Sequence, residues 1–423
     1  MTHIGRRFAA AALVLAAACK DQGSPGAQGS SGGQVAVPAT IKIGATLPLT
    51  GSEARIGGFY KEGYEYAFEL QNKNGGVSLG GKKVPVSLTL LDDTSTQATA
   101  VSLADRLINS DKVDFLLGTY ASHLVEAQSA VAEQNQMPYV NGGGAASQIY
   151  KKGYKWIFGL LAPVELLADA EMRWIDDQQK AGKLPKPSKI ALLWENTAHG
   201  KDFRTGVNDF AKKSGGGYEV VIDESFELNG KDFSALLGKV KAANVDLFLA
   251  DAHLPDYITM QRQYVTAGMC HKVMSYGARG SEKQAAEALG AKNIAYILSS
   301  VWWGPLLAEH NPLAKEFVAG FKAKYNKAPE WYQALGYETA RALFVGIEQA
   351  GSVDRAKVRE ALAKLKMPSI LPVGQLEFPA EFGQQVHAPF VVQQNQPDGS
   401  SPIVYPKESA TGDGVAPNPN CPK

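Results

Sequence analysis

The stretch that decides the fold of this chain of 423 residues is Ile41-Lys42-Ile43-Gly44-Ala45-Thr46-Leu47-Pro48-Leu49-Thr50-Gly51. Its apolar residues predict a strand that runs into a turn at the proline and the last glycine, since both residues favour turns. Apolar residues then recur at helical spacing through Tyr60, Tyr64 and Phe68. A strand, a turn and a helix in this order predict the first part of a βαβ unit.

The same rhythm continues along the chain, with helical spacing between short apolar runs. The further predicted strands are Val84 to Leu90, Val113 to Leu117, Pro138 to Val140, Ile190 to Trp194, Tyr218 to Ile222 and Val245 to Ala250. The segment Lys112 to Leu117 resembles Asn244 to Leu249, as expected of two similar halves. Strands that alternate with helices predict parallel sheets, and two such halves predict two α/β lobes.

Two facing lobes would form a cleft suited to a small molecule. Ligands of open α/β sheets bind beyond the carboxyl ends of the strands, and two facing sheets bring these ends to one cleft. The formal net charge of +1 and the absence of a basic run exclude nucleic acid as an expected partner. No Cys-x-x-Cys pair or clustered histidine spacing indicates a metal site, so we expect neither a metal nor a cofactor.

The N-terminus has the pattern of a signal peptide over residues 1–19. Arg6 and Arg7 precede an apolar run, Phe8 to Ala18, which is too short to span a bilayer as a stable helix. Small residues directly before Cys19 resemble a bacterial lipoprotein cleavage site, and plain secretion is the alternative. Residues 20–39 are rich in Gly, Ser, Gln and Pro and are predicted to form a flexible linker. The protein is therefore expected outside the cytoplasm, in the periplasm or at the cell surface.

Three cysteines are present, and two remain if Cys19 is lipidated. Cys270 and Cys421 could pair in an oxidising compartment, or Cys421 could be a free thiol. Cys421 lies in a segment rich in Pro, Asn and Gly, and residues 408–423 are predicted to be a disordered tail.

Several blocks in a fixed order resemble the leucine/isoleucine/valine-binding protein family, the type I periplasmic receptors of ABC transporters. These blocks are Ile41 to Gly51, Gly57, Gly63, Asn72 to Gly76, Leu91 to Ser95, Val113 to Gly118, Met137 to Val140, Gly336 to Ala340 and Gly374 to Phe378. The resemblance implies the type I periplasmic-binding-protein fold, with two Rossmann-like lobes joined by a three-crossing hinge. It implies lobe 1 at residues 40–160 and 300–371, and lobe 2 at residues 161–299 and 372–407.

The resemblance also implies function. The chain would be a receptor that captures a small polar molecule (an amino acid, an amide, or a carboxylate or aromatic acid) by hinge closure and presents it to a membrane permease. Nothing in the sequence demands more than a monomer. A ligand-sensing subunit of a signalling partner is an alternative. A hydrolase that uses Ser122 with His123 or His199 is a weaker one, since the sequence contains no nucleophile elbow.

The family's ligand loops can be placed in this sequence one at a time. The predicted ligand-binding residues are Ile56, Tyr120, Ser122, Gly143, Ala145, His199 and His253 by loop position, with Arg55 and Trp303 as further candidates. Ile56 and Ala145 depart from the aromatic and hydroxyl residues usual at these positions.

Arg279 is the departure that bears most on the ligand. Amino-acid binders often place a carboxylate in this loop to pair with the ligand ammonium, whereas this chain has Gly277-Ala278-Arg279-Gly280. A guanidinium there favours an acidic or carbonyl-bearing ligand. The open alternative is that Asp251, Glu195 or Glu165 supplies the negative charge.

Overall fold

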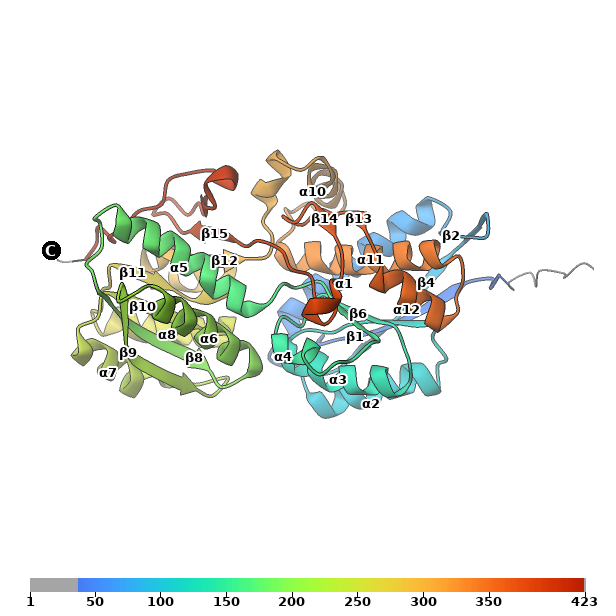
Figure 1. Cartoon of the computed structure of the whole chain (residues 1–423), viewed down its shortest axis with the longest axis horizontal. Coiled ribbons are helices and arrows are strands. Elements are labelled where there is room, and N and C mark those ends of the chain that lie inside the picture. Colours follow the sequence, from blue (N-terminus) through green and yellow to red (C-terminus); the bar gives the residue numbers. More distant parts are fainter. Residues whose placement is uncertain (1–36, 422–423) are drawn as a thin grey trace, which may run out of the picture. The chain divides into compact units, whose positions relative to one another are not determined.

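A computed structural model describes residues 37–421, and its first half is built on a parallel sheet. Its five strands are ordered β4-β1-β5-β6-β7, and every neighbouring pair is parallel (Figure 1). The strands are β1 (Ile41–Leu47), β4 (Val86–Asp92), β5 (Phe115–Leu117), β6 (Tyr139–Asn141) and β7 (Ile157–Gly159). The strands predicted in this half are confirmed, since alternating apolar runs flanked by turns form the buried strands of the sheet.

The half of the molecule around this sheet, called the first half, also contains seven helices, three of which come from late in the sequence. They are α1 (Ala54–Lys73), α2 (Gln97–Asn109), α3 (Ser122–Gln134), α4 (Ser147–Tyr150), α10 (Pro312–Tyr325), α11 (Trp331–Ala350) and α12 (Arg355–Ala363). The long helices α1 and α11 pack closely because Gly63 brings α1 against the backbone of α11. A β-carbon at Gly63 would lie 2.4 Å from the carbonyl oxygen of Gln333. A capping box between Glu330 and Gln333 fixes the start of α11.

The second half is built on a seven-stranded sheet ordered β16-β15-β12-β11-β10-β8-β9. The strands are β8 (Ser188–Glu195), β9 (Tyr218–Phe226), β10 (Leu247–Asp251), β11 (Val273–Ser275), β12 (Ile297–Val301), β15 (Val391–Gln394) and β16 (Ile403–Tyr405). The first five are parallel, as predicted, but β15 pairs antiparallel with β12 and β16 antiparallel with β15. This sheet is therefore mixed, because the chain enters β15 from the first half and runs opposite to β12.

The helices of this half are α5 (Val164–Lys180), α6 (Ala198–Lys213), α7 (Ser234–Ala243), α8 (Leu254–Thr266) and α9 (Lys283–Leu289). Gly206 brings α6 close to α5, since a β-carbon there would lie 2.6 Å from the carbonyl oxygen of Glu165. Two small antiparallel ladders complete the fold: β2 (Val77–Leu79) with β3 (Lys82–Val84), and β13 (Met367–Pro368) with β14 (Gln375–Leu376). Residues 37–421 also contain five 3-10 helices: Gly277–Arg279, Ala291–Ile294, Pro305–Glu309, Ala380–Phe382 and Lys407–Ser409.

The chain passes between the two sheets three times: from β7 to β8, from β12 to α10, and from β14 to β15. Trp302 and Trp303 lie on the second passage, and both are buried in an apolar cluster that also contains Ile43 of β1 and Leu192 of β8. The two halves therefore share one continuous apolar core around the passages.

Residues 408–421, for which the sequence predicts disorder, pack against the second half. Cys421 is disulfide-bonded to Cys270, the pairing that the sequence left open. The backbone N–H of Asn418 donates to the carbonyl of Lys272 at 2.8 Å, and Gly414 lies against the indole of Trp174. The chain is thus ordered through Cys421.

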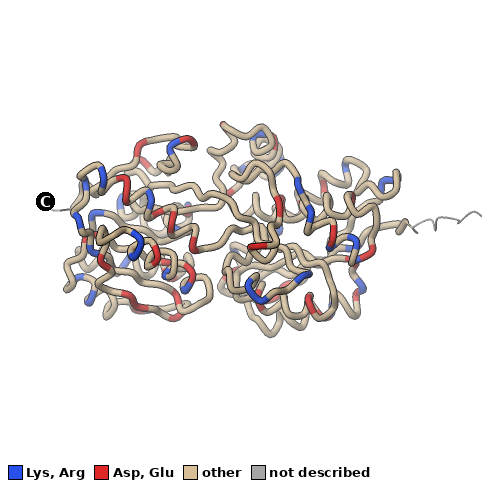
Figure 2. The backbone as a smooth tube through the Cα atoms, viewed as in Figure 1, with Lys and Arg blue, Asp and Glu red and all other residues tan. Residues whose placement is uncertain are grey.

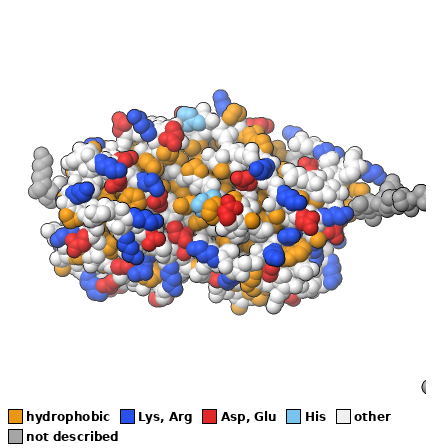
Figure 3. Space-filling view, viewed as in Figure 1, with side chains coloured by type: hydrophobic (Ala, Val, Ile, Leu, Met, Phe, Trp, Pro, Cys, Tyr) orange, Lys and Arg blue, Asp and Glu red, His pale blue; other side chains and the backbone are white. Residues whose placement is uncertain are grey.

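The predicted signal peptide (1–19), Cys19 and most of the linker (20–39) lie outside the described residues. Within residues 37–421, no helix has both the length and the apolar content needed to cross a membrane. Lys and Arg residues intermingle with Asp and Glu along the backbone (Figure 2). On the face seen in Figure 3, apolar side chains are interspersed with charges of both signs.

Candidate ligand-binding site

A cavity lies where strands of both sheets end. It is small in this structure, with a volume of about 10 Å³, and lies between residues at or after the ends of β5, β6, β8, β10 and β11. Its lining residues are Tyr120, Ala121, Ser122, His123, Gly143, Ala145, Leu161, Glu195, Thr197, His199, His253, Arg279, Trp302 and Trp331. The carboxyl ends of parallel strands thus meet at one cavity, as the sequence predicts.

On the side of the first sheet, the cavity is lined by uncharged groups. Ser122 begins α3 and is buried, and its Oγ accepts hydrogen bonds from the N–H groups of Ala145 at 3.1 Å and Ala146 at 3.2 Å. This Oγ receives two protons, so its own hydroxyl proton is available to an acceptor. The first N–H groups of α3 also have no acceptor within the helix, as at any helix N-terminus.

Two aromatic rings support this side. Tyr120 stacks on Tyr60 with the ring centroids 5.6 Å apart, and the Tyr60 hydroxyl donates to the carbonyl of Gly142. Gly143 is required by close packing, because a β-carbon there would lie 2.0 Å from the carbonyl oxygen of Thr119. These contacts fix the loops that follow β5 and β6.

On the side of the second sheet, the cavity is lined by ionisable groups, starting with Glu195 and His253. Glu195 Oε2 accepts from His253 Nδ1 at 2.5 Å and from the backbone N–H of His253 at 3.1 Å. Burial alone would lower the pKa of His253, but the adjacent Glu195 carboxylate outweighs burial and raises it to about 9. Burial opposes ionisation of Glu195 as well, yet the His253 cation holds the pKa of that carboxyl well below its usual range. The pair is therefore charged at neutral pH.

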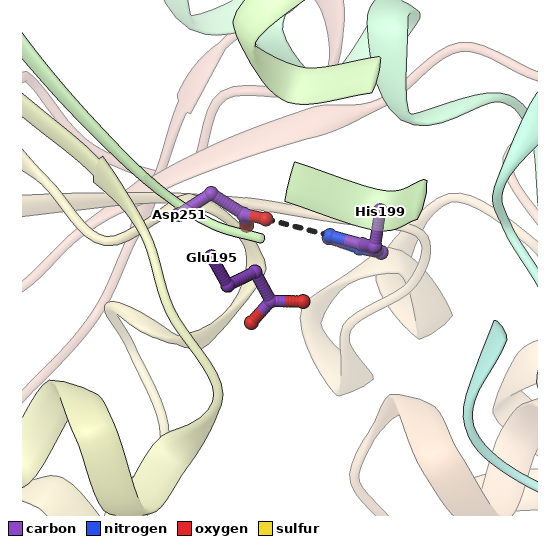
Figure 4. A group of neighbouring side chains, drawn as sticks. All are labelled: Glu195, His199 and Asp251. Carbon is purple, nitrogen blue, oxygen red and sulfur yellow. Dashed lines mark hydrogen bonds and ion pairs between the residues drawn. The ribbon is translucent and has the colours of Figure 1, made fainter. Parts of the chain in front are cut away.

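A second histidine–carboxylate pair lies beside the first. His199 Nδ1 lies 2.7 Å from Asp251 Oδ2 (Figure 4). On the other side of the ring, His199 Nε2 lies 3.4 Å from Arg279 Nη1. Because a carboxylate and a guanidinium flank the ring, the network assigns the proton to Nδ1 and the lone pair to Nε2. Asp251 Oδ1 lies beneath Gly277, where a β-carbon would be 2.6 Å away and where φ is +55°. Asp251 itself does not line the cavity.

Glu195, His199 and Asp251 can each offer one ligand atom to a metal, and these atoms lie within 4.8 Å of one another (Figure 4). In the structure, however, each of them already has a partner. Glu195 is bound to His253, and His199 and Asp251 are bound to each other. Arg279 adds a positive charge 3.4 Å from His199 Nε2, which opposes a second cation there. The arrangement fits two hydrogen-bonded pairs better than a metal centre.

Arg279 is 2% exposed and lies in the 3-10 helix Gly277–Arg279 directly after β11. Its Nη2 donates to the Tyr120 hydroxyl at 2.8 Å, so this bond joins the two sides of the cavity. No carboxylate lies within ion-pair distance of Arg279 among residues 37–421, although arginine is charged at any physiological pH. Arg279 is therefore a buried cation without a direct counter-ion.

The structure brings together seven residues that the sequence predicts for ligand binding: Tyr120, Ser122, Gly143, Ala145, His199, His253 and Arg279. The other three do not line this cavity. Arg55 is half exposed and pairs with Glu287 at 3.7 Å. Ile56 is buried in the core, and the Trp303 indole donates to the carbonyl of Ile370.

The predicted ligand-binding set did not include Ala121, His123, Leu161, Glu195, Thr197, Trp302 and Trp331, which also line the cavity. Of these, Glu195 was named only as an alternative negative charge and His123 only as a hydrolytic partner of Ser122. Trp302 faces the cavity in place of its neighbour Trp303. Burial, and then the His253 cation, lower the pKa of His123 to about 4, so that His123 is neutral. Its position next to Ser122 was a signal that could have found it, whereas no sequence signal marks Trp331, which comes from α11.

The fold and this cavity define a class of protein, the two-lobed α/β binding proteins that hold a small solute at the strand ends. The chain belongs to the periplasmic binding protein family, whose family model matches residues 40–400. This membership implies a location outside the cytoplasm. Members of this family are solute-binding proteins and not enzymes.

Several relatives carry amino-acid names. The leucine-, isoleucine-, valine-, threonine- and alanine-binding protein of Pseudomonas aeruginosa is 27% identical over 339 residues, 80% of this chain and 86% of the relative. The Leu/Ile/Val-binding protein homolog 8 of Brucella suis is 27% identical over 391 residues, 90% of this chain and 94% of the relative.

Solved structures share the fold. The leucine-binding protein LivK of Thermotoga maritima matches with a TM-score of 0.75 and 24% identity, over 86% of this chain and 97% of that one. A solute-binding protein of R. palustris in complex with benzoate matches with a TM-score of 0.72 and 22% identity, over 89% of this chain and 98% of that one.

Proposed function

We propose that this protein is the receptor of an ABC transporter, and that it captures a small carboxylate in the cavity between its two halves. The single observation that carries the ligand class is Arg279, a buried cation that lines the cavity without a carboxylate partner among the described residues. A buried charge is costly unless it is paired, and a ligand carboxylate would supply the missing partner in the fork geometry that guanidinium favours.

A ligand ammonium would find no free carboxylate in this cavity. Both oxygens of Glu195 already accept hydrogen bonds, from Thr197 and from His253. Neither Asp251 nor Glu165 lines the cavity. Glu165 accepts hydrogen bonds from Ser147 Oγ at 2.6 Å and from Lys151 Nζ at 3.3 Å.

Closure around the ligand is supported by the hydrogen bond between Arg279 and Tyr120, which joins the two sides of the cavity. Tyr120 belongs to the first half and Arg279 to the second, and their hydrogen bond is 2.8 Å long. A carboxylate beside Arg279 would also reach the Tyr120 hydroxyl and would favour the closed arrangement by its contacts with both halves. Such differential contact is what biases a hinge.

Several further features belong to this proposal. The hinge would comprise the three passages, with lobe 1 at 40–160 and 300–371 and lobe 2 at 161–299 and 372–407. A lipid on Cys19 would hold the receptor at a membrane, and the closed monomer would present its ligand to a permease.

A thermal-shift screen of the purified protein tests the ligand class. The protein is first partly unfolded to remove any carried ligand and is then mixed with carboxylates, amino acids, amides and amines of similar size. A ligand at about one hundred times its dissociation constant adds about 2.7 kcal/mol to the folded state, a shift of several degrees. Carboxylates without an ammonium group are expected to give the largest shifts. Stabilisation by amines or amino acids alone would contradict the carboxylate class, and silence across the panel would contradict the receptor for small polar solutes.

A further inference from the structure

We infer that the ligand is a monocarboxylate with an uncharged hydrogen-bond acceptor near the carboxylate, as in a 2-oxo acid, and that His253 Nε2–H donates to this second group. The inference rests on the proposed function, since it takes the carboxylate to lie beside Arg279. It adds which chemical group replaces the ammonium of an amino acid.

His253 is placed to donate into the cavity. It is 4% exposed and lines the cavity, and its Nδ1 is bound to Glu195 at 2.5 Å. Its Nε2 is buried and has no hydrogen-bond partner among residues 37–421. With Nδ1 and the backbone N–H both held by one carboxylate, the ring is fixed in place. A buried N–H without a partner is costly, so a ligand that accepts this proton is favoured.

The other free polar groups of the cavity are also donors. The Ser122 hydroxyl accepts two backbone N–H groups and retains its own proton, and the buried Trp331 Nε1 has no partner among the described residues. Among the acceptors that line the cavity, Glu195 accepts from His253 and Thr197, Thr197 Oγ1 accepts from the N–H of Gly200, and the neutral His123 ring keeps one unprotonated nitrogen. A ligand that mainly accepts hydrogen bonds matches this lining, whereas an ammonium carries three protons and finds no free carboxylate.

The charges of the lining residues set the charge of the ligand. His253 and Glu195 form a matched pair, and His123 is neutral. Arg279 is the one lining cation without a carboxylate in contact among residues 37–421. Asp251 balances part of the Arg279 charge from beyond the His199 ring, but it does not line the cavity. Arg279 can therefore take one ligand carboxylate in direct contact, and the second acceptor is uncharged. A dicarboxylate would bring an extra negative charge into a buried site and pay its desolvation without a partner.

Calorimetric titrations with matched compounds test this at pH 7. Three carbon skeletons are each supplied as the 2-oxo acid, the 2-amino acid and the unsubstituted acid: pyruvate, alanine and propionate; 4-methyl-2-oxopentanoate, leucine and 4-methylpentanoate; phenylpyruvate, phenylalanine and 3-phenylpropionate. On every skeleton that binds, the oxo acid is expected to bind at least tenfold tighter than the unsubstituted acid and at least a hundredfold tighter than the amino acid.

The other outcomes separate this inference from the proposed function. Equal affinity for oxo and unsubstituted acids would overturn the second acceptor and leave the carboxylate receptor standing. Tighter binding of the amino acids would overturn both the inference and the carboxylate class. Absence of binding on all three skeletons would overturn the inference, while the wider thermal-shift screen would still decide the proposed function.

A variant tests the role of His253 itself. In His253→Asn the shorter amide can still donate to Glu195 but no longer presents a donor at the position of Nε2. The preference for oxo over unsubstituted acids is expected to fall from at least tenfold to about twofold or less, whereas a purely structural loss would weaken both acids equally. The control is His271→Asn, since His271 is also buried but binds Tyr264 outside the cavity and should leave the preference unchanged. If His253→Asn does not fold, the comparison of matched ligands on the natural protein decides.

Discussion

The two sides of the cavity use the same architecture but different chemistry. The residues after β5 present the hydroxyl groups of Tyr120 and Ser122, and the loop after β6 presents Gly143 and Ala145, so this side is uncharged. The loops after β8, β10 and β11 present Glu195, His253 and Arg279, all ionised. Uncharged donors can orient many ligands at modest energy, whereas buried charges discriminate strongly between ligand charges. Under the proposed function, selectivity for ligand charge is therefore expected to reside in the residues of the second sheet.

The largest expected effect comes from reversing the charge at Arg279. Arg279→Glu should weaken the binding of the preferred carboxylate about 1,000-fold, or about 4 kcal/mol, since loss of one partner of a buried charge pair costs about 2–5 kcal/mol and a like charge adds repulsion. Titration calorimetry measures the change. The matched control is Arg173→Gln, whose parent side chain is exposed and pairs with Asp169 away from the cavity. An unchanged preference for carboxylates over amines in Arg279→Glu would contradict the proposed ligand class.

The next effect concerns stability against pH. His253 has its pKa raised from the ordinary 6.5 to about 9, and burial raises the pKa of Glu171, a residue of α5, to about 8. Both groups bind protons more tightly in the folded state, so their contribution is fully present below their ordinary pKa values and is lost as the pH rises through the folded ones. The free energy of unfolding should fall by on the order of 5 kcal/mol between pH 6 and pH 9, with similar shares from the two groups.

Glu171→Gln separates the two contributions to this pH dependence. The amide keeps a hydrogen-bond partner for Ser275 but does not titrate, so about half of the loss between pH 6 and pH 9 should disappear. Urea unfolding at several pH values measures the difference. Constant stability of the natural protein across this range would show that the buried charges of the second half do not govern it.

A smaller effect is expected from the uncharged side of the cavity. Ser122→Ala removes one neutral hydroxyl and should weaken ligand binding about fivefold, near 1 kcal/mol. The loss should be similar for acids and amides, because the hydroxyl carries no charge. A loss as large as that of Arg279→Glu, or one confined to acids, would erase the distinction between the two sides.

The smallest effect on ligand affinity is expected at an exposed ion pair outside the cavity. Arg55 of α1 and Glu287 of α9 form an ion pair at 3.7 Å, and both side chains are at least half exposed. Exposed ion pairs contribute little, so Arg55→Ala should change ligand affinity by less than about twofold. A change of tenfold or more in a titration would place Arg55 in the site, as the sequence first suggested.

The periodicity of the sequence predicts most of the fold, because buried strands and amphipathic helices leave their spacing in the chain. It does not predict that β15 and β16 run antiparallel, since direction depends on where the chain enters the sheet. It likewise does not show that the segment ending at Cys421 is ordered, because that order comes from a disulfide and from contacts with distant residues.

The sequence predicts those residues of the candidate site that lie close after the ends of strands. It does not predict the residues that reach the cavity only through tertiary contacts. Loop position finds Ser122 and Arg279, because both follow strands directly. It does not distinguish Trp302 from Trp303, since neighbouring residues of an extended chain face opposite ways. Trp331 reaches the cavity from a helix far along the sequence, and the engagement of Glu195 with His253 is visible only in three dimensions.

The structure of the protein with the tightest-binding compound of the thermal-shift screen tests the central claim most directly. A carboxylate oxygen of the ligand is expected about 2.7–3.2 Å from the guanidinium of Arg279, with a second acceptor near His253 Nε2. A ligand ammonium bound to Glu195, or a ligand with no polar atom beside Arg279, would contradict the account.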